Sequence, residues 1–214
     1  MGTITESFSN LSDYLGSEYK KSKKRSTQVN LVLSKVLEPL LPSSIRCGSG
    51  TIIDIKDRQV GPLDIIASVD AFPPFGDGQA ATYLADGTIF VLQVRDWSEN
   101  DLTEFAELAA QLKKLEKKKK TPVPCLAISF APIELSEISQ FLRSKPGQSL
   151  EGVLCIGHHI VLRNSLGWYG DPSRVPYVTE RSGPEALKAF TFFLLQIAQL
   201  SLAMPFGLAD YQHL

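Results

Sequence analysis

From residue 88 onward, the chain alternates between strand-like and helix-like segments, and this alternation constrains the fold more than any other feature. Residues 88–97, TIFVLQVRDW, and 121–131, TPVPCLAISFA, are short and apolar, as buried strands are. Residues 98–120 and 132–145 carry apolar side chains three and four positions apart, which predicts helices. A chain that interleaves strands and helices in this way indicates a sheet covered by helices, so we expect an α/β fold.

The chain before residue 88 starts with helices and continues with strands. Residues 3–24 and 26–42 predict two amphipathic helices, and Pro39 and Pro42 close the second. Residues 45–70 alternate in polarity and are rich in Ile, which predicts two or three strands. This part of the chain therefore adds strands to the same sheet.

The remaining segments complete the predicted order of elements. We expect a loop with a short strand over residues 71–87, a hairpin over 151–164, a loop over 168–183 and a long helix over 184–203. The predicted architecture is a three-layer α/β domain with a mixed central sheet flanked by helices. We assign residues 1–25 to an N-terminal helical extension and residues 26–214 to the domain itself.

Composition excludes several classes of protein. The net charge is -1, so an attraction to nucleic acid would have to come from a local patch. The three cysteines are widely spaced and form no CxxC motif, which argues against a zinc site or disulfide framework and favours a reducing, cytoplasmic location. The last apolar segment is interrupted by Gln196, Gln199 and Pro205, so we expect a buried helix and no contact with a membrane.

Polar residues occupy two predicted strands where apolar ones are usual. Asp64 follows Gly-Pro-Leu in GPLDIIASVD, while Gln93 and Arg95 alternate with apolar residues in GTIFVLQVRDW. A solvated strand face, or an Asp bonded to nearby backbone N–H groups, is the simpler explanation of such residues. Their occurrence on two successive strands also fits the remains of a catalytic site.

The segment LLPSSIRCGSGTIIDIKDRQVGPLDIIASVD, followed by GTIFVLQVRDW, resembles the restriction-endonuclease-like PD-(D/E)xK superfamily. The likeness is closest to a microbial branch and covers roughly residues 26–200. In this superfamily a hairpin Asp and a second acid bind Mg²⁺, a Lys orients the attacking water, and some members add an acid from the first core helix. Hard oxygen ligands and a divalent cation suit a reaction in which negative charge grows on a phosphodiester.

Carried over by position, the resemblance assigns the hairpin acid to Asp64, the second acid to Gln93, the Lys to Arg95 and the helix acid to Asn30. An arginine stays protonated and cannot act as a base, and two neutral amides weaken Mg²⁺ binding. The resemblance therefore implies a degenerate catalytic site without a cofactor. We predict that Asp64 and Arg95 pair bidentately across the strands and fill the former metal site.

Two basic runs are candidate phosphate-binding residues. The first ends the predicted N-terminal helix and the second ends the helix predicted over residues 98–120; they comprise Lys20, Lys21, Lys23, Lys24 and Arg25, and Lys117, Lys118, Lys119 and Lys120. A run of lysines is more often a solvated helix end, where cations are favoured. The two runs form one binding face only if they lie together.

Three functions remain open from the sequence. The leading hypothesis is a pseudo-nuclease that acts as a DNA-, RNA- or protein-binding regulatory module, within the microbial and phage defence functions that the resemblance implies. The second is an active endonuclease in which Asp64, Gln93 and the Val94 carbonyl hold Mg²⁺ and Arg95 stabilises the phosphate charge. The third is a structural protein that binds a partner. The sequence leaves the oligomeric state open.

Overall fold

The computed structural model of the chain describes residues 3–76, 81–118, 122–164, 171–180 and 183–202. The principal helices and strands, in chain order, are α1 (Thr3–Lys21), α2 (Arg25–Leu31), β1 (Ile45–Ile53), β2 (Gln59–Val69), β3 (Thr82–Leu84), β4 (Thr88–Val94), α3 (Glu99–Leu112), β5 (Cys125–Ser129), α4 (Leu135–Arg143), β6 (Gly152–Cys155), β7 (His159–Arg163), β8 (Tyr177–Glu180) and α5 (Gly183–Leu202).

The described strands form one mixed sheet in the order β3-β1-β2-β4-β5-β6-β7-β8. Strands β1, β2 and β4 pair antiparallel, β4, β5 and β6 pair parallel, and β6, β7 and β8 return to antiparallel pairing. Helix α3 connects β4 to β5 and α4 connects β5 to β6, as parallel pairing requires. These three strands lie at the centre of the sheet, with antiparallel strands on either side. Strand β4 therefore joins the N-terminal hairpin to the parallel part of the sheet.

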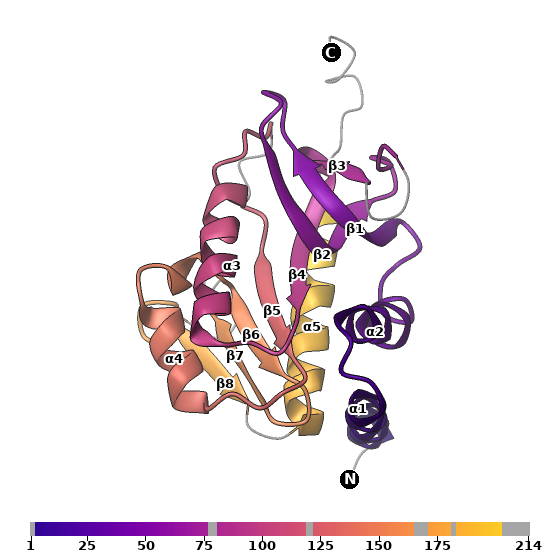
Figure 1. Ribbon diagram of the computed structural model, residues 1–214, viewed down its shortest axis with the longest axis vertical. Helices are drawn as coiled ribbons and strands as arrows, with labels where there is room; N and C mark the ends of the chain where they lie inside the picture. Colours follow the sequence, from indigo (N-terminus) through magenta and orange to yellow (C-terminus); the bar gives the residue numbers. More distant parts are fainter. Residues whose placement is uncertain (1–2, 77–80, 119–121, 165–170, 181–182, 203–214) are drawn as a thin grey trace.

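Helices cover both faces of this sheet (Figure 1). Helices α3 and α4 lie on one face, where Phe105 and Ile138 belong to a buried cluster. Helices α1, α2 and α5 lie on the other face, where Leu15, Leu37 and Phe190 belong to a second cluster. The predicted three-layer α/β architecture with a mixed central sheet is confirmed.

The two N-terminal helices pack onto the domain. Leu15 of α1 is fully buried, and α1 lies against α5. Helix α2 continues into a π-helical segment, Val32–Leu37, which ends two residues before Pro39. A π-helical turn has one more residue than an α-helical turn, so it changes which side chains face the sheet.

Strand β8 replaces part of a predicted loop. The sequence predicts a loop over residues 168–183, but Tyr177–Glu180 pairs antiparallel with β7 at the edge of the sheet. The strand has only four residues and follows Pro176, so its alternation is too short to stand out from the loop before it. This part of the prediction is wrong, and the sheet gains an edge strand.

The tip of the β1–β2 hairpin is fixed to the segment after α3 by one buried carboxylate. Asp54 accepts hydrogen bonds from the backbone N–H groups of Lys56, Arg58 and Glu116 at 2.9, 3.0 and 2.8 Å, and its side chain is completely buried. The Arg58 guanidinium also contacts it, with Nε at 2.8 Å and Nη2 at 2.6 Å from Oδ2. Asp54 thus connects two segments that are 62 residues apart.

The sequence predicts a buried helix over residues 184–203, and α5 is buried along one side. Its residues Phe190, Leu194 and Ile197 lie in the core. Within the described ranges, none of the helices is both long enough and apolar enough to span a bilayer.

Candidate functional site

The candidate site forms where the β2–β4 ladder ends. The last regular pair in this direction is Ile65 opposite Leu92. Beyond it, side chains take over the backbone hydrogen bonds. The Asp64 N–H donates to Gln93 Oε1 at 2.8 Å, and the Val94 N–H donates to Asp64 Oδ2 at 2.8 Å. Asp64 and Gln93 therefore lie side by side, as their positions in the sequence predict, and each side chain accepts a hydrogen bond from a backbone N–H of the other strand.

Asp64 pairs with Arg25, the first residue of α2. Arg25 Nη2 lies 2.8 Å from Asp64 Oδ1, and Arg25 Nε donates to Oδ2 at 3.3 Å. The predicted pairing of Asp64 with Arg95 is wrong. A guanidinium from the N-terminal helices occupies the position that we expected Arg95 to take. The Asp64 side chain is 13% exposed, and that of Arg25 is 48% exposed.

Arg95 points away from Asp64, towards the start of α3. Its Nη1 lies 3.4 Å from Asp101 Oδ1, and its guanidinium carbon lies 4.9 Å from the centre of the Trp97 ring. Asp101 and Ser98 form the capping box of α3, and the Ser98 hydroxyl and N–H, together with the Arg95 charge, lower the pKa of Asp101. The Arg95 Nε is buried and has no hydrogen-bond partner among the described residues. Arg95 is thus held by a cation–π contact and a long ion pair, and it retains an unused donor.

Arg25 and Arg95 line the same small cavity, of about 200 Å³, which is open to solvent. Its other lining residues are Pro62, Gln93, Glu104, Phe105 and Leu108. Glu104 of α3 was not among the predicted site residues. Glu104 precedes the buried Phe105, and nothing in the sequence around it indicates that it lines this cavity. The cavity therefore combines two guanidinium groups with one amide and one exposed carboxylate.

The arrangement does not fit Mg²⁺. Asp64 supplies one carboxylate, but both of its oxygens contact Arg25, and Gln93 Oε1 accepts the Asp64 N–H. Within the described part of the chain, no three His, Cys, Asp or Glu side chains come together as a metal site. A divalent cation would meet one negative charge already paired with a positive one, so its binding in this arrangement is unfavourable.

The helix position assigned by the resemblance is exposed to solvent. The Asn30 side chain is exposed, whereas Gln28 on the same helix is 1% exposed and its Oε1 has no hydrogen-bond partner among the described residues. The assignment counted back from Leu41-Pro42 through a regular helix. The π-helical segment Val32–Leu37 lies in that interval and shifts the phase of the count.

The described residues of the two basic runs lie at opposite ends of the parallel strands. The first run leads directly into Arg25 and thus to Val94 at the end of β4; Lys20, Lys23 and Lys24 in this run are exposed, and Lys21 pairs with Glu18. In the second run, the charge of Lys117 interacts with Asp86 and Cys125, which lie at the starts of β4 and β5. Lys118 is exposed, whereas Lys119 and Lys120 lie outside the described residues.

Lys117 has the properties of a partly buried lysine. Burial lowers its pKa to about 8, although the charge of Asp86 opposes the shift. Because the unfolded chain holds this proton up to about pH 10.4 and the folded chain releases it near pH 8, Lys117 by itself should raise the free energy of unfolding over this interval. Burial raises the pKa of Cys47 and Cys125 to about 12, which acts in the opposite direction in the wild type and in Lys117→Met alike. In urea titrations at pH 7.5, 8.5 and 9.5, the free energy of unfolding of the wild type relative to Lys117→Met should therefore increase with pH; a constant difference would contradict the assignment.

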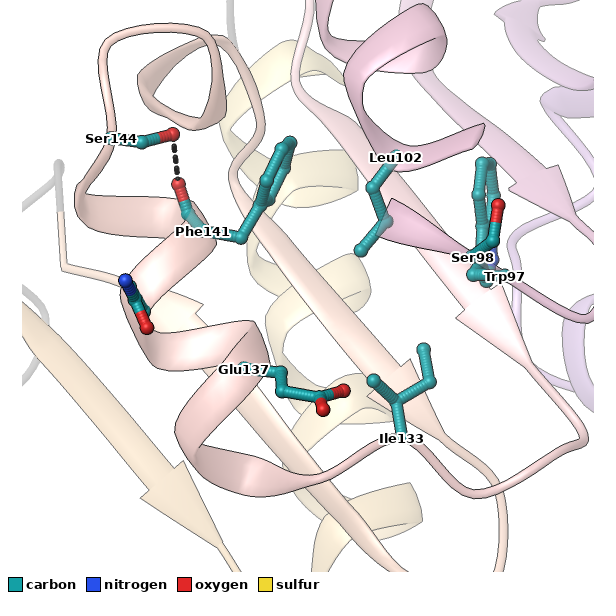
Figure 2. A pocket seen from close by; sticks show the side chains of 8 residues that line it. Trp97, Ser98, Leu102, Ile133, Glu137, Phe141 and Ser144 are labelled. Carbon is teal, nitrogen blue, oxygen red and sulfur yellow. Dashed lines mark hydrogen bonds between the residues drawn. The ribbon is translucent and has the colours of Figure 1, made fainter. Parts of the chain in front are cut away.

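A larger cavity adjoins the site on the other side of Trp97 (Figure 2). It measures about 400 Å³ and lies between the start of α3 and helix α4. Figure 2 shows the Phe141 ring extending from α4 towards Leu102, and the Glu137 carboxylate extending towards Ile133. Trp97 lines this cavity and also carries Arg95 against its ring. A change at Trp97 therefore affects both spaces.

Comparisons of sequence give no relative. No protein-family model matches the chain, and no curated protein matches it.

Solved structures match the fold along almost the whole chain. The structure of NucC from E. coli MS115-1 in its cAAA-bound form gives a TM-score of 0.77 at 12% identity, covering 98% of this chain and 96% of that chain. Its apo form gives 0.71 at 13% identity, covering 98% and 97%. NucC from P. aeruginosa ATCC27853, cAAA-bound, gives 0.76 at 12% identity, covering 100% and 98%. Together with the mixed sheet flanked by helices, this likeness shows that the fold of the chain is restriction-endonuclease-like.

Proposed function

We propose that the chain binds the phosphate backbone of nucleic acid where β4 and its ladder with β2 end, beside Asp64. The observation that carries this proposal is that Arg25 and Arg95, from different elements, line one solvent-open cavity. The exposed lysines Lys20, Lys23 and Lys24 continue the positive charge along the chain from Arg25. A local patch of this kind supplies the attraction that the net charge of -1 does not.

The two arginines are suited to phosphate because each keeps part of its side chain accessible. The Arg25 side chain is 48% exposed although it pairs with Asp64, and the Arg95 side chain is 24% exposed and lies 3.4 Å from Asp101. A phosphodiester offers both guanidinium groups bidentate, charge-assisted hydrogen bonds.

Binding without cleavage is the function that this geometry supports best. Asp64 and Gln93 make hydrogen bonds within the sheet, and the arrangement does not favour Mg²⁺. We therefore propose a nuclease-fold binding or regulatory module. Its place in microbial phage defence is part of the same proposal, supported by the resemblance and by the likeness to NucC.

Salt dependence of binding tests the proposal and separates the two basic runs. Replacing Lys23, Lys24 and Arg25 by glutamine should weaken binding to a double-stranded DNA oligonucleotide. It should also reduce the slope of log affinity against log salt by about 2.7, since each released counterion contributes about 0.9. Fluorescence anisotropy at several salt concentrations measures both quantities.

The matched control replaces Lys118, Lys119 and Lys120 by glutamine, which removes the same charge from the second basic run. We expect the slope of this variant to equal that of the wild type. The reverse result, a reduced slope only in the second variant, would move the binding surface to the end of α3. No binding by the wild type to DNA or RNA would refute the proposal and favour a protein that binds a protein partner.

A second candidate function is a Mg²⁺-dependent DNA endonuclease. The likeness to NucC over the whole chain favours it, as does the presence of Asp64 and Gln93 together at the strand ends. Incubation with supercoiled DNA and Mg²⁺ tests this candidate, with Asp64→Asn in parallel because asparagine keeps the size of the side chain. Cleavage by the wild type that is lost in the variant would establish it. Equal results for both proteins would leave the binding module as the function.

The likeness also suggests a ligand to try. NucC carries cAAA in two of the matching structures, so cAAA belongs among the ligands tested for binding to this chain. The oligomeric state should be measured by light scattering with and without it.

A further inference from the structure

Arg25 is placed where the resemblance expects a divalent cation, and its placement is unusual for an arginine. It is the first residue of α2, at the helix end where backbone N–H groups give a positive potential. A cation is disfavoured at that end, and the side-chain cap of α2 is missing. The contacts with both oxygens of Asp64 offset this cost. The ion pair with Asp64 therefore explains why an arginine stands at the start of α2, where the helix itself disfavours a cation.

The segment before Arg25 is attached to the same strand ends at a second point. The Tyr19 hydroxyl donates to Asp96 Oδ2 at 3.0 Å, and the Tyr19 ring stacks on Phe130 at 5.6 Å between ring centres. Asp96 lies next to Arg95 after β4, and Phe130 follows β5. Residues 19–25 therefore cross the ends of both parallel strands, with one contact at each end of the segment.

We infer that residues 19–25 form a latch on the candidate site, with Arg25 as an internal counter-ion that keeps divalent cations away from Asp64. This inference rests on the proposed function only for the location of the site. It adds that the Arg25 charge is one cause of the poor fit to Mg²⁺, beside the engaged Gln93 amide oxygen. When Arg25 leaves, the Asp64 carboxylate loses its ion pair and keeps the hydrogen bond from the Val94 N–H.

The two partners differ in how easily they can move. Arg25 is half exposed and gains hydration when it leaves, whereas Asp64 is 13% exposed and stays bound to the Val94 N–H. Opening the latch therefore moves the cation and leaves the carboxylate in place. Glu104 of α3 lines the cavity that Arg25 also lines.

Mn²⁺ binding, without nucleic acid, tests the latch. We expect Arg25→Ala to bind Mn²⁺ on the order of tenfold more tightly than the wild type, because one competing positive charge near Asp64 is removed. Arg25→Lys should behave like the wild type. The double variant Arg25→Ala with Asp64→Asn should lose the gain. Electron paramagnetic resonance of free Mn²⁺ measures all four proteins, and circular dichroism checks that each is folded.

The control is Arg174→Ala, which removes an arginine that is 86% exposed and remote from the site in the sequence; its Mn²⁺ affinity should not change. Equal Mn²⁺ affinity in Arg25→Ala and the wild type would overturn the latch, and so would a gain that persists without the Asp64 carboxylate. Because the assay contains no DNA or RNA, failure of nucleic-acid binding does not affect it. The two proposals can therefore fail separately.

Discussion

Replacing Asp54 by alanine is expected to lower the free energy of unfolding by about 3–5 kcal/mol, the range for breaking a buried charge network by removing one partner. The variant leaves three backbone N–H groups, those of Lys56, Arg58 and Glu116, without their acceptor, and it leaves the Arg58 guanidinium unpaired on this side. Urea unfolding at pH 7 measures the effect. Asp13→Ala, on the exposed side of α1, is the matched control and should change stability by less than about 0.5 kcal/mol.

The effect of Asp54 should depend on pH in one direction. Burial alone would raise the pKa of this carboxyl, but hydrogen bonds from Glu116, Arg58 and Lys56 outweigh burial and lower the pKa to about 2. A lowered pKa adds stability above the unfolded value, near pH 3.9, and this stability is lost as the pH falls towards 2. The difference between the wild type and Asp54→Ala should therefore shrink below pH 4. A difference that stays constant down to pH 2.5 would argue against the network.

Replacing Trp97 by alanine is expected to cost about 3–5 kcal/mol of stability, as for other buried aromatic residues. The ring is 8% exposed and packs on Phe105 at 5.5 Å between ring centres, and its Nε1 donates to the Ile128 carbonyl at 2.8 Å. The change also removes the surface on which the Arg95 guanidinium lies. Nucleic-acid affinity should fall together with stability, because Arg95 loses the contact that orients it.

Trp97→Phe separates these two effects. It keeps an aromatic face for Arg95 but loses the Nε1 hydrogen bond, while the Ile128 carbonyl keeps the Arg95 N–H at 3.1 Å. We expect a loss of stability of about 1 kcal/mol, the usual contribution of a hydrogen bond, and nearly unchanged nucleic-acid binding. Thermal unfolding and anisotropy titrations give the two values. If the Phe variant binds as weakly as the Ala variant, the cation–π contact is not what positions Arg95.

The sequence predicts most of the fold because its signals are local and repeated. The strand at residues 88–94 is marked by a short apolar run, and the helix after Ser98 by its hydrophobic period and its cap; both form close to where they are expected. The neighbourhood of Asp64 and Gln93 also follows from sequence, because antiparallel pairing of their strands brings these positions together. The edge strand β8 is missed because four residues carry too little pattern.

The partners of the site residues could not be predicted in the same way. Arg25 reaches Asp64 across 39 positions of sequence, and no local pattern specifies that contact. Arg95 and Trp97 are two positions apart after β4, and their side chains meet there. The wrong pairing of Asp64 with Arg95 thus has a physical reason, an ion pair between residues far apart in the sequence. Asn30 at the helix-acid position stays a prediction.

The end of the β2–β4 ladder has a consequence for how such chains change over time. Asp64 and Gln93 supply the acceptors that the Val94 and Asp64 N–H groups need once regular pairing stops. A descendant that no longer cut nucleic acid would still lose stability on replacing either residue, so the architecture alone would preserve them. The Arg95 side chain contacts Asp101 and the Trp97 ring instead, so backbone pairing at the end of the ladder does not constrain residue 95. Backbone hydrogen bonding therefore preserves Asp64 and Gln93 whether or not the site cuts nucleic acid, whereas the residue at position 95 is preserved only by what it binds.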